Sequence, residues 1–375
     1  MKKFFIVVTF FISVCNVVAQ QGNIQYSPGM FATERYLYAA QKDGLYRLEQ
    51  KEDDNPTEWE TAAFVGVPIR QAVISGDSII ATTALEGPDS LLLFSVDGGK
   101  SFIDYTPKEL WLQHRLDNTM PIQPYSMTIS SDDVLVISIH NSGVYSSVDF
   151  GKTWLLLPDA IPGAFVAYNP NDSKQLFACY ETMAMTGDIA MSLDNGQTWE
   201  RVFSRPTIWI NGLAFHPMNR RRVFVYGTGI SAISDDQGYT WTNLFDYSTE
   251  DVKNKFFSAV VYDNMQQNVV YAAKCDGNEV SIYRSDDGGC LWTMQERIFA
   301  ECEVGNLGSL CIIERVLYIN TARGGVLTFN LDTGTKIKNL VKEMSCPHYY
   351  DLMGHKTVHP TRGIYIKGGK KVVIK

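Results

Sequence analysis

Five aspartates at near-regular spacing are the residues of this 375-residue chain whose type and pattern most suggest chemistry. Each lies in a copy of the phrase Ser-x-Asp-x-Gly-x-Thr-Trp, in which the last two positions vary in some copies. Aligned carboxylates of this kind suggest catalytic acids, because general acid–base catalysis often uses Asp or Glu. The five residues are Asp97, Asp149, Asp194, Asp236 and Asp287.

The same phrase also has a structural logic. A short Asp side chain can accept hydrogen bonds from backbone N–H groups just downstream and fix a turn. Gly two residues later tolerates a positive φ, and the closing Thr-Trp pair opens a strand whose large ring can pack between neighbouring units. Besides the five aspartates, the residues assigned to this role are Gly99, Gly151, Trp154, Gly196, Trp199, Gly238, Trp241, Gly289 and Trp292. We therefore interpret the phrase as a turn that joins two strands.

The copies recur with a period that predicts stacked units. With the degenerate copies at Asp54 and Asp332, the intervals between successive aspartates are 43, 52, 45, 42, 51 and 45 residues. Between copies the sequence reads as four short strands, for example 208–215, 222–226, 229–233 and 241–245. This order predicts an all-β fold, a single β-propeller with seven four-stranded blades. The expected blades span 24–64, 68–105, 123–158, 164–203, 208–246, 256–297 and 306–342.

The five intact copies resemble Asp-boxes, also called BNR repeats. Such repeats occur in sialidases, sortilin-type receptor domains, two-propeller xyloglucanases and the photosystem II assembly-factor propellers. The resemblance covers residues 24–342 and implies a propeller whose boxes lie at outer turns, away from the ligand face. It therefore implies that the five aspartates are structural rather than catalytic.

A sialidase-like glycoside hydrolase is the enzymatic alternative. That resemblance implies an arginine cluster for a substrate carboxylate, a Tyr–Glu nucleophile pair and a further acidic residue. The family's Arg-Ile-Pro sequence is absent, and 67–70 reads Val-Pro-Ile-Arg instead. No G-x-S-x-G, H-E-x-x-H or Walker A motif is present, and His355 and His359 are interpreted as incidental surface residues of the tail. We expect no metal and no cofactor.

A non-enzymatic binding propeller is the preferred function. If the turns of the phrase lie on one face, the second-to-third-strand loops and the blade connections form the opposite face. Trp, Arg and Asn there suit a protein or glycan partner, by stacking and directed hydrogen bonds. The candidate binding residues are Arg70, Trp111, Arg115, Tyr180, Glu181, Arg205, Trp209, Asn211 and Arg323. Trp111 and Trp209 could instead fill gaps between blades.

The N-terminus predicts export. Lys2 and Lys3 precede an apolar stretch and a small-residue site ending at Ala19, which is typical of a secretory signal over residues 1–19. We expect a secreted, periplasmic or cell-surface monomer without a transmembrane segment. Six cysteines follow the signal without the spacing of a disulfide framework or a C-x-x-C pair. The formal net charge of −8 argues against nonspecific nucleic-acid binding.

The C-terminal segment 343–375 follows the propeller domain, 20–342. The sequence Tyr-Asp-Leu-Met-Gly-His-Lys at 350–356, with a Gly-Gly-Lys-Lys at 368–371, resembles the end of the sorting domain of type IX secretion in Bacteroidetes. That resemblance implies delivery to the cell envelope or the exterior. The alternative is a terminal β-hairpin packed on the propeller.

Overall fold

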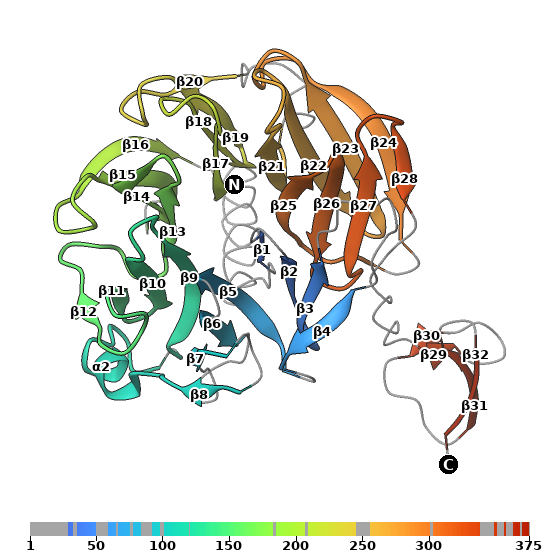
Figure 1. Cartoon of the computed structure of the whole chain (residues 1–375), viewed down its shortest axis with the longest axis horizontal. Coiled ribbons are helices and arrows are strands. Elements are labelled where there is room, and N and C mark those ends of the chain that lie inside the picture. The colour runs from blue at the N-terminus through green and yellow to red at the C-terminus, as the bar shows by residue number, and fades with distance from the viewer. Residues whose placement is uncertain are drawn as a thin grey trace, which may run out of the picture.

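The computed structural model shows sheets arranged in a ring (Figure 1). It describes residues 29–32, 36–49, 59–64, 67–75, 78–83, 92–97, 101–119, 121–182, 185–206, 209–244, 256–300 and 303–337, and the tail strands at 349–350, 356–357, 363–367 and 370–374. Side chains are described as far as residue 334. The predicted signal segment 1–19, Asp54, Gly99, Cys302, Cys346 and the tail histidines lie outside the described residues.

Seven antiparallel sheets, each made of four consecutive strands, form the ring and confirm the predicted seven-bladed propeller. Blades 1 and 2 contain β1 (Met30–Ala32), β2 (Tyr36–Gln41), β3 (Gly44–Glu49) and β4 (Glu60–Ala63), then β5 (Ile69–Ser75), β6 (Ser78–Thr83), β7 (Leu92–Ser95) and β8 (Ile103–Asp104). Blades 3 and 4 contain β9 (Gln123–Ile129), β10 (Leu135–His140), β11 (Gly143–Ser147) and β12 (Leu155–Leu156), then β13 (Phe165–Asn169), β14 (Asp172–Glu181), β15 (Thr186–Ser192) and β16 (Glu200–Pro206).

The remaining three blades repeat the pattern. They contain β17 (Trp209–Phe215), β18 (Val223–Thr228), β19 (Ile230–Ser234) and β20 (Thr242–Asn243); β21 (Ala259–Tyr262), β22 (Val270–Asp276), β23 (Glu279–Ser285) and β24 (Thr293–Phe299); and β25 (Leu307–Ile313), β26 (Val316–Thr321), β27 (Val326–Asn330) and β28 (Thr335–Ile337). In the described part of the chain, a short helix, α2 (Lys108–Gln113), lies in the connection between blades 2 and 3. Among the described residues no helix is both long and apolar enough to cross a bilayer.

The two faces of the ring follow from the antiparallel order within each blade. The first-to-second and third-to-fourth turns share one end, which carries the five turns of the phrase and is called the repeat-turn face. The second-to-third turns and the blade connections share the other end, called the mouth face. The separation that the sequence predicted between the aspartate turns and the candidate binding residues is therefore built into the topology.

Each repeat turn is closed by its own aspartate. In blade 3, the Ser147 hydroxyl donates to Asp149 at 2.8 Å, and the Thr153 N–H and hydroxyl donate to the two carboxylate oxygens at 2.8 and 2.6 Å. The turns at Asp194 and Asp236 repeat these bonds within 0.1 Å. Both oxygens of the carboxylate are therefore engaged within the turn itself.

The glycine of each repeat turn also sets how closely two blades approach. Gly196 has φ +85°, and a Cβ there would lie 2.6 Å from Leu157 of the preceding blade. Gly238 has φ +96° and meets Phe177 of its preceding blade in the same way. Glycine is therefore required twice, for its positive φ and for the close contact. The tryptophans that follow pack in the cores between blades, as predicted.

The ring closes between blades 7 and 1 without exchange of a strand. The buried Asn320 of β26 donates from Nδ2 to the carbonyl oxygens of Gly29 at 2.9 Å and Ala40 at 3.2 Å, and its Oδ1 accepts from Gln41. Met30 N–H adds a bond to Ser309 Oγ at 3.2 Å. Polar side chains therefore close the ring at this seam.

The C-terminal segment forms a small four-stranded sheet of its own. Its strands are β29 (Tyr349–Tyr350), β30 (Lys356–Thr357), β31 (Gly363–Lys367) and β32 (Lys370–Ile374), in the order β30-β29-β31-β32. The hairpin of β31 and β32 is the longest pairing in this sheet. The sheet is seen to one side of the ring in Figure 1, so the structure has more in this segment than the single hairpin expected.

The described cysteines are not joined to one another. Cys179 is buried, Cys275 and Cys311 are half-buried and Cys290 is exposed, and all four are free thiols. The sequence interpretation of small, mostly buried residues fits three of them. Cys290 differs because it occupies the variable position after Gly289 in a repeat turn.

Replacement of Asn320 by Leu should weaken the seam, because it leaves buried carbonyl groups without a donor. We expect a loss of about 1–3 kcal/mol in the free energy of unfolding. The Ala40 amide, which donates to Gly29 O at 3.0 Å, should exchange its hydrogen faster. The control is Asn169→Leu, which removes a buried asparagine that bonds within blade 4. Equal exchange at Ala40 in both variants would contradict closure by Asn320.

Replacement of Asp149 by Asn should flatten the acid dependence of stability. Burial raises the pKa of Asp149, but hydrogen bonds from Thr153, Ser147 and the Lys152 N–H outweigh it and lower the pKa to about 2. Because the folded pKa lies below the unfolded value of about 3.9, this contribution is present above that value and is lost as the pH falls toward 2. Urea unfolding at several pH values should therefore show a smaller loss of stability in the variant. The control is Asp132→Asn, at an exposed aspartate. An equal loss of unfolding free energy with falling pH in the wild type, Asp149→Asn and Asp132→Asn would contradict a contribution of Asp149 to stability.

Candidate functional site

The candidate site lies where the innermost strands begin at the mouth face. Arg70 is the second residue of β5, and Trp209 is the first residue of β17. Glu181 is the last residue of β14, a second strand that ends at the same face. Tyr125 lies near the start of β9, the innermost strand of blade 3. Side chains from four blades therefore lie at the mouth face. We call Arg70, Tyr125, Glu181 and Trp209 the mouth cluster.

The members of the mouth cluster influence one another's pKa values. Burial raises the pKa of Glu181, and the Trp209 side chain acts on it in the opposite direction with a smaller effect. Burial also raises the pKa of the Tyr125 hydroxyl; Glu181 raises it further, while Arg70 lowers it. A carboxylate, a guanidinium, a phenol and an indole therefore act on one another across blades 2 to 5.

β-Bulges place extra residues at this level of the innermost strands. In blades 2, 3 and 5 the pairing of the first strand with the second skips one residue, which is Arg70, Tyr125 and Asn211 respectively. A bulged residue leaves the ladder and its side chain is re-aimed, a feature that is common next to binding sites. Asn211 is exposed, and its Nδ2 donates to Phe257 O of blade 6 at 3.3 Å. The three bulges give the mouth a set of polar side chains that a regular strand would not present.

A second group of charges lies at the seam of the mouth face. Lys42, between β2 and β3, and Arg323, between β26 and β27, occupy equivalent turns of blades 1 and 7. Burial lowers the pKa of Lys42, and the positive charge of Arg323 lowers it further. Arg323 also pairs with Glu303 at 3.2 Å. Two cations therefore lie close to each other across the seam, and Glu303 supplies a counter-charge to one of them.

The structure separates the other candidate residues from the mouth cluster. Trp111 of α2 is only 1% exposed and packs in the core between blades 2 and 3, so it fills a gap. Arg115 is half-buried beside Asp117, whose pKa it helps to lower. Arg205 lies on the outer strand β16, over the ring of Phe203 at 5.7 Å. Tyr180 lines a cavity on the side of blade 4.

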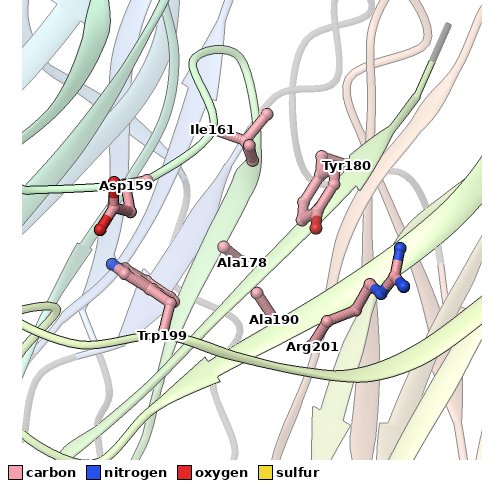
Figure 2. A pocket seen from close by; sticks show the side chains of 8 residues that line it. Asp159, Ile161, Ala178, Tyr180, Ala190, Trp199 and Arg201 are labelled. Carbon is pink, nitrogen blue, oxygen red and sulfur yellow. The ribbon is translucent and has the colours of Figure 1, made fainter.

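Two cavities lie outside the mouth cluster. The larger, about 350 Å³, is lined by the innermost strands of blades 5 to 7 toward the repeat-turn face, and its side chains are almost all apolar. The smaller, about 170 Å³, lies between the 159–161 connection and the sheet of blade 4, and Figure 2 shows its lining residues. Among the described residues no cluster of three or more His, Cys, Asp or Glu side chains is arranged to hold a metal ion.

Sequence reasoning missed Tyr125, Lys42 and Asp188. Tyr125 follows a proline in the expected first strand of blade 3. It lies near the start of that strand, as Arg70 does in blade 2, and this equivalent position was the signal that could have identified it. Lys42 lies in the second-to-third turn of blade 1, a class of loop that the sequence had already placed on the mouth face. Asp188 is a buried carboxylate inside β15 that accepts from Ser204 at 2.8 Å, and nothing local in the sequence distinguishes it.

The comparisons with known proteins support the fold. No protein-family model matches the chain, and no curated protein sequence matches it either. Among solved structures, the GH74 xyloglucanase from Xanthomonas campestris matches with a TM-score of 0.59 at 15% identity, over 82% of this chain and 53% of that one. This chain therefore spans about half the length of that enzyme.

A second group of solved structures matches the chain over almost their whole length. YCF48 bound to D1 peptide has a TM-score of 0.55 at 17% identity, over 82% of this chain and 95% of that one. YCF48 from Cyanidioschyzon merolae has a TM-score of 0.54 at 16% identity, over 82% and 97%. At these identities the likeness shows a shared β-propeller fold, which hosts both an enzyme and a peptide-bound protein.

Proposed function

We propose that this chain is an exported Asp-box propeller whose mouth face binds an extended segment of an extracellular or envelope protein. The observation that carries the proposal is the mouth cluster together with Asn211, because bulges in three inner strands and the ends of β14 and β17 bring charged, aromatic and amide groups to one face across blades 2 to 5. Groups spread over several blades suit an extended chain better than one compact ligand. One propeller of the same fold, YCF48, has been solved with a bound peptide.

The partner segment should be acidic on the side that meets the seam. Lys42 and Arg323 lie on adjacent blades, and Arg70 adds a third cation from blade 2. These cations belong to a chain whose formal net charge is −8, so an acidic partner would depend on them for its attraction. Complementary charge gives such an interface specificity and speeds association.

The proposal also includes export of the protein and a role in that export for its C-terminal segment. A signal over residues 1–19 would deliver the propeller to the periplasm, the surface or the exterior, as a monomer. The sorting-like segment 343–375, which folds as a sheet in its strands β29 to β32, would direct its last step. The four free thiols described need no partner for the ring to close.

Removal of the seam charges should weaken binding of an acidic peptide. The probes are two fluorescein-labelled peptides of equal length, one acidic and one with Lys replacing each acidic residue, followed by fluorescence anisotropy. We expect Lys42→Gln with Arg323→Gln to lower the affinity for the acidic peptide at least about tenfold, the scale of one to two lost charge contacts.

The matched control carries the same charge change on the other face. Lys152 and Arg220 are exposed residues of the repeat-turn face, so Lys152→Gln with Arg220→Gln should leave the affinity unchanged. Equal losses in both double variants would show nonspecific attraction and overturn the proposed site. Equal affinity of the wild type for both peptides would overturn it as well.

Sialidase-like hydrolysis is the second candidate, and one observation favours it. Tyr125 and Glu181 are coupled beside Arg70, and a Tyr–Glu pair near an arginine is what the family resemblance requires. If this is the function, the purified protein should release 4-methylumbelliferone from its sialoside. Tyr125→Phe should then abolish the release and Tyr180→Phe should not. No release by the folded wild-type protein would exclude this activity.

A further inference from the structure

Blade 4 has two small residues side by side in its sheet, at a position where blades 2, 3, 5, 6 and 7 carry at least one larger residue. The comparison concerns one pair of residues in each blade. The first member lies in the third strand, two residues before the serine position of the repeat turn, and the second is the residue of the second strand that pairs with it. In blade 4 these two paired residues are Ala190 and Ala178. In the other blades with a described pair, one of the two is larger, namely Leu93, Tyr145, Val225, Tyr283 and Tyr318. The small cavity lies over the two alanines of blade 4.

The walls of this cavity carry polar groups of both charges. Figure 2 shows Tyr180, Arg201, Trp199 and Asp159 arranged around the two alanine side chains, with Ile161 above them. The Arg201 side chain is 65% exposed, and its guanidinium lies 3.4 Å from the buried Asp188 carboxylate. Asp159 is exposed and has φ +53°, on the connection from blade 3. The cavity is therefore reached from solvent between blades 3 and 4.

The Trp199 indole differs from its counterparts in the other repeat turns. Trp154, Trp241 and Trp292 donate their indole N–H to their own turn glycine carbonyl, at 3.0, 2.9 and 2.7 Å. The buried Trp199 N–H makes no hydrogen bond. The bond that fixes the other three rings is thus missing for the ring that lines the cavity.

We propose that this cavity binds one neutral pyranose ring. An apolar cavity of about 150 Å³ holds a benzene molecule, so about 170 Å³ admits the ring of a pyranose whose hydroxyl substituents lie toward the exposed rim. The alanine floor and the Trp199 ring offer apolar contact to a sugar face. Arg201, Tyr180 and Asp159 lie at its rim and offer hydrogen-bond donors and acceptors. These suit sugar hydroxyl groups, which can both donate and accept hydrogen bonds.

The charges around the cavity argue against an acidic ligand. Asp188 neutralises Arg201, and Asp159 adds a further negative charge, so a carboxylate would meet one cation and two anions. A ligand with hydroxyl groups satisfies Arg201 and Asp159 at once. This site lies on the side of blade 4, apart from the mouth cluster, and does not depend on the function proposed there.

Saturation-transfer difference NMR with methyl glucoside, galactoside, mannoside and N-acetylglucosaminide tests the proposal on the whole protein. We expect millimolar binding of at least one of them. Ala190→Leu, which places at this position the residue that blade 2 carries as Leu93, should abolish the saturation transfer. Arg201→Lys keeps the charge beside Asp188 but loses the planar fork, and it should weaken binding at least about fivefold.

The control is Ala232→Leu, the same change at the equivalent position of blade 5, where binding should be unaltered. Circular dichroism melting curves show which variants fold. If Ala190→Leu does not fold, the effect of Arg201→Lys on sugar binding tests the proposal. No saturation transfer to any of the four sugars by the folded wild type would overturn the proposal. Binding that survives both Ala190→Leu and Arg201→Lys would do so too, and would place the sugar elsewhere. Loss of peptide binding in the mouth variants has no bearing on these results.

Discussion

Closure of the ring between its first and last blades is the constraint on which the rest of this structure depends. Among the described residues, every blade takes its four strands from one continuous stretch, so no strand ties blade 7 to blade 1. Among the residues that the structure describes, the seam core has two buried hydrophobic residues, Ala39 and Val326, with Met30, Trp59 and Tyr318 partly buried against them, whereas each of the other six interfaces has at least seven buried ones. With a smaller described apolar core, the bonds of Asn320 take a larger share in joining the two blades. The mouth face is complete only while this seam is closed.

The ring could be predicted from the sequence because its determinants are local and repeated. The serine, aspartate and glycine of a repeat turn bond within four residues of one another, so their spacing survives in the sequence as a readable phrase. The second role of the glycine, its contact with the preceding blade, was not readable from one copy. It depends on which side chain of the neighbour faces it, such as Leu157 for Gly196.

The candidate site was only partly predictable because it depends on register rather than on residue type. The nine proposed residues were all placed at the mouth end of their elements, yet only Arg70, Glu181 and Trp209 meet there. Arg70 and the unpredicted Tyr125 each lie at a β-bulge of their inner strand. The position of such a bulge cannot be recognised in the alternating pattern of a strand sequence. Trp111 was misjudged for a related reason. An exposed-looking connection folded as α2 and buried its one large apolar ring.

The cavity of blade 4 forms where the connection from blade 3 passes over two small residues. After Leu157, which still donates to Val144 O of its own sheet at 2.8 Å, the chain at 159–161 lines the cavity over blade 4. The sheet beneath it has two alanines where other blades carry a larger residue. A ring bound between them would contact both blades and stabilise their interface by mass action. A ligand at the mouth would instead bridge inner strands. Two modes of binding can therefore coexist, because the repeat turns that build the ring leave both the mouth and this blade wall open to variation.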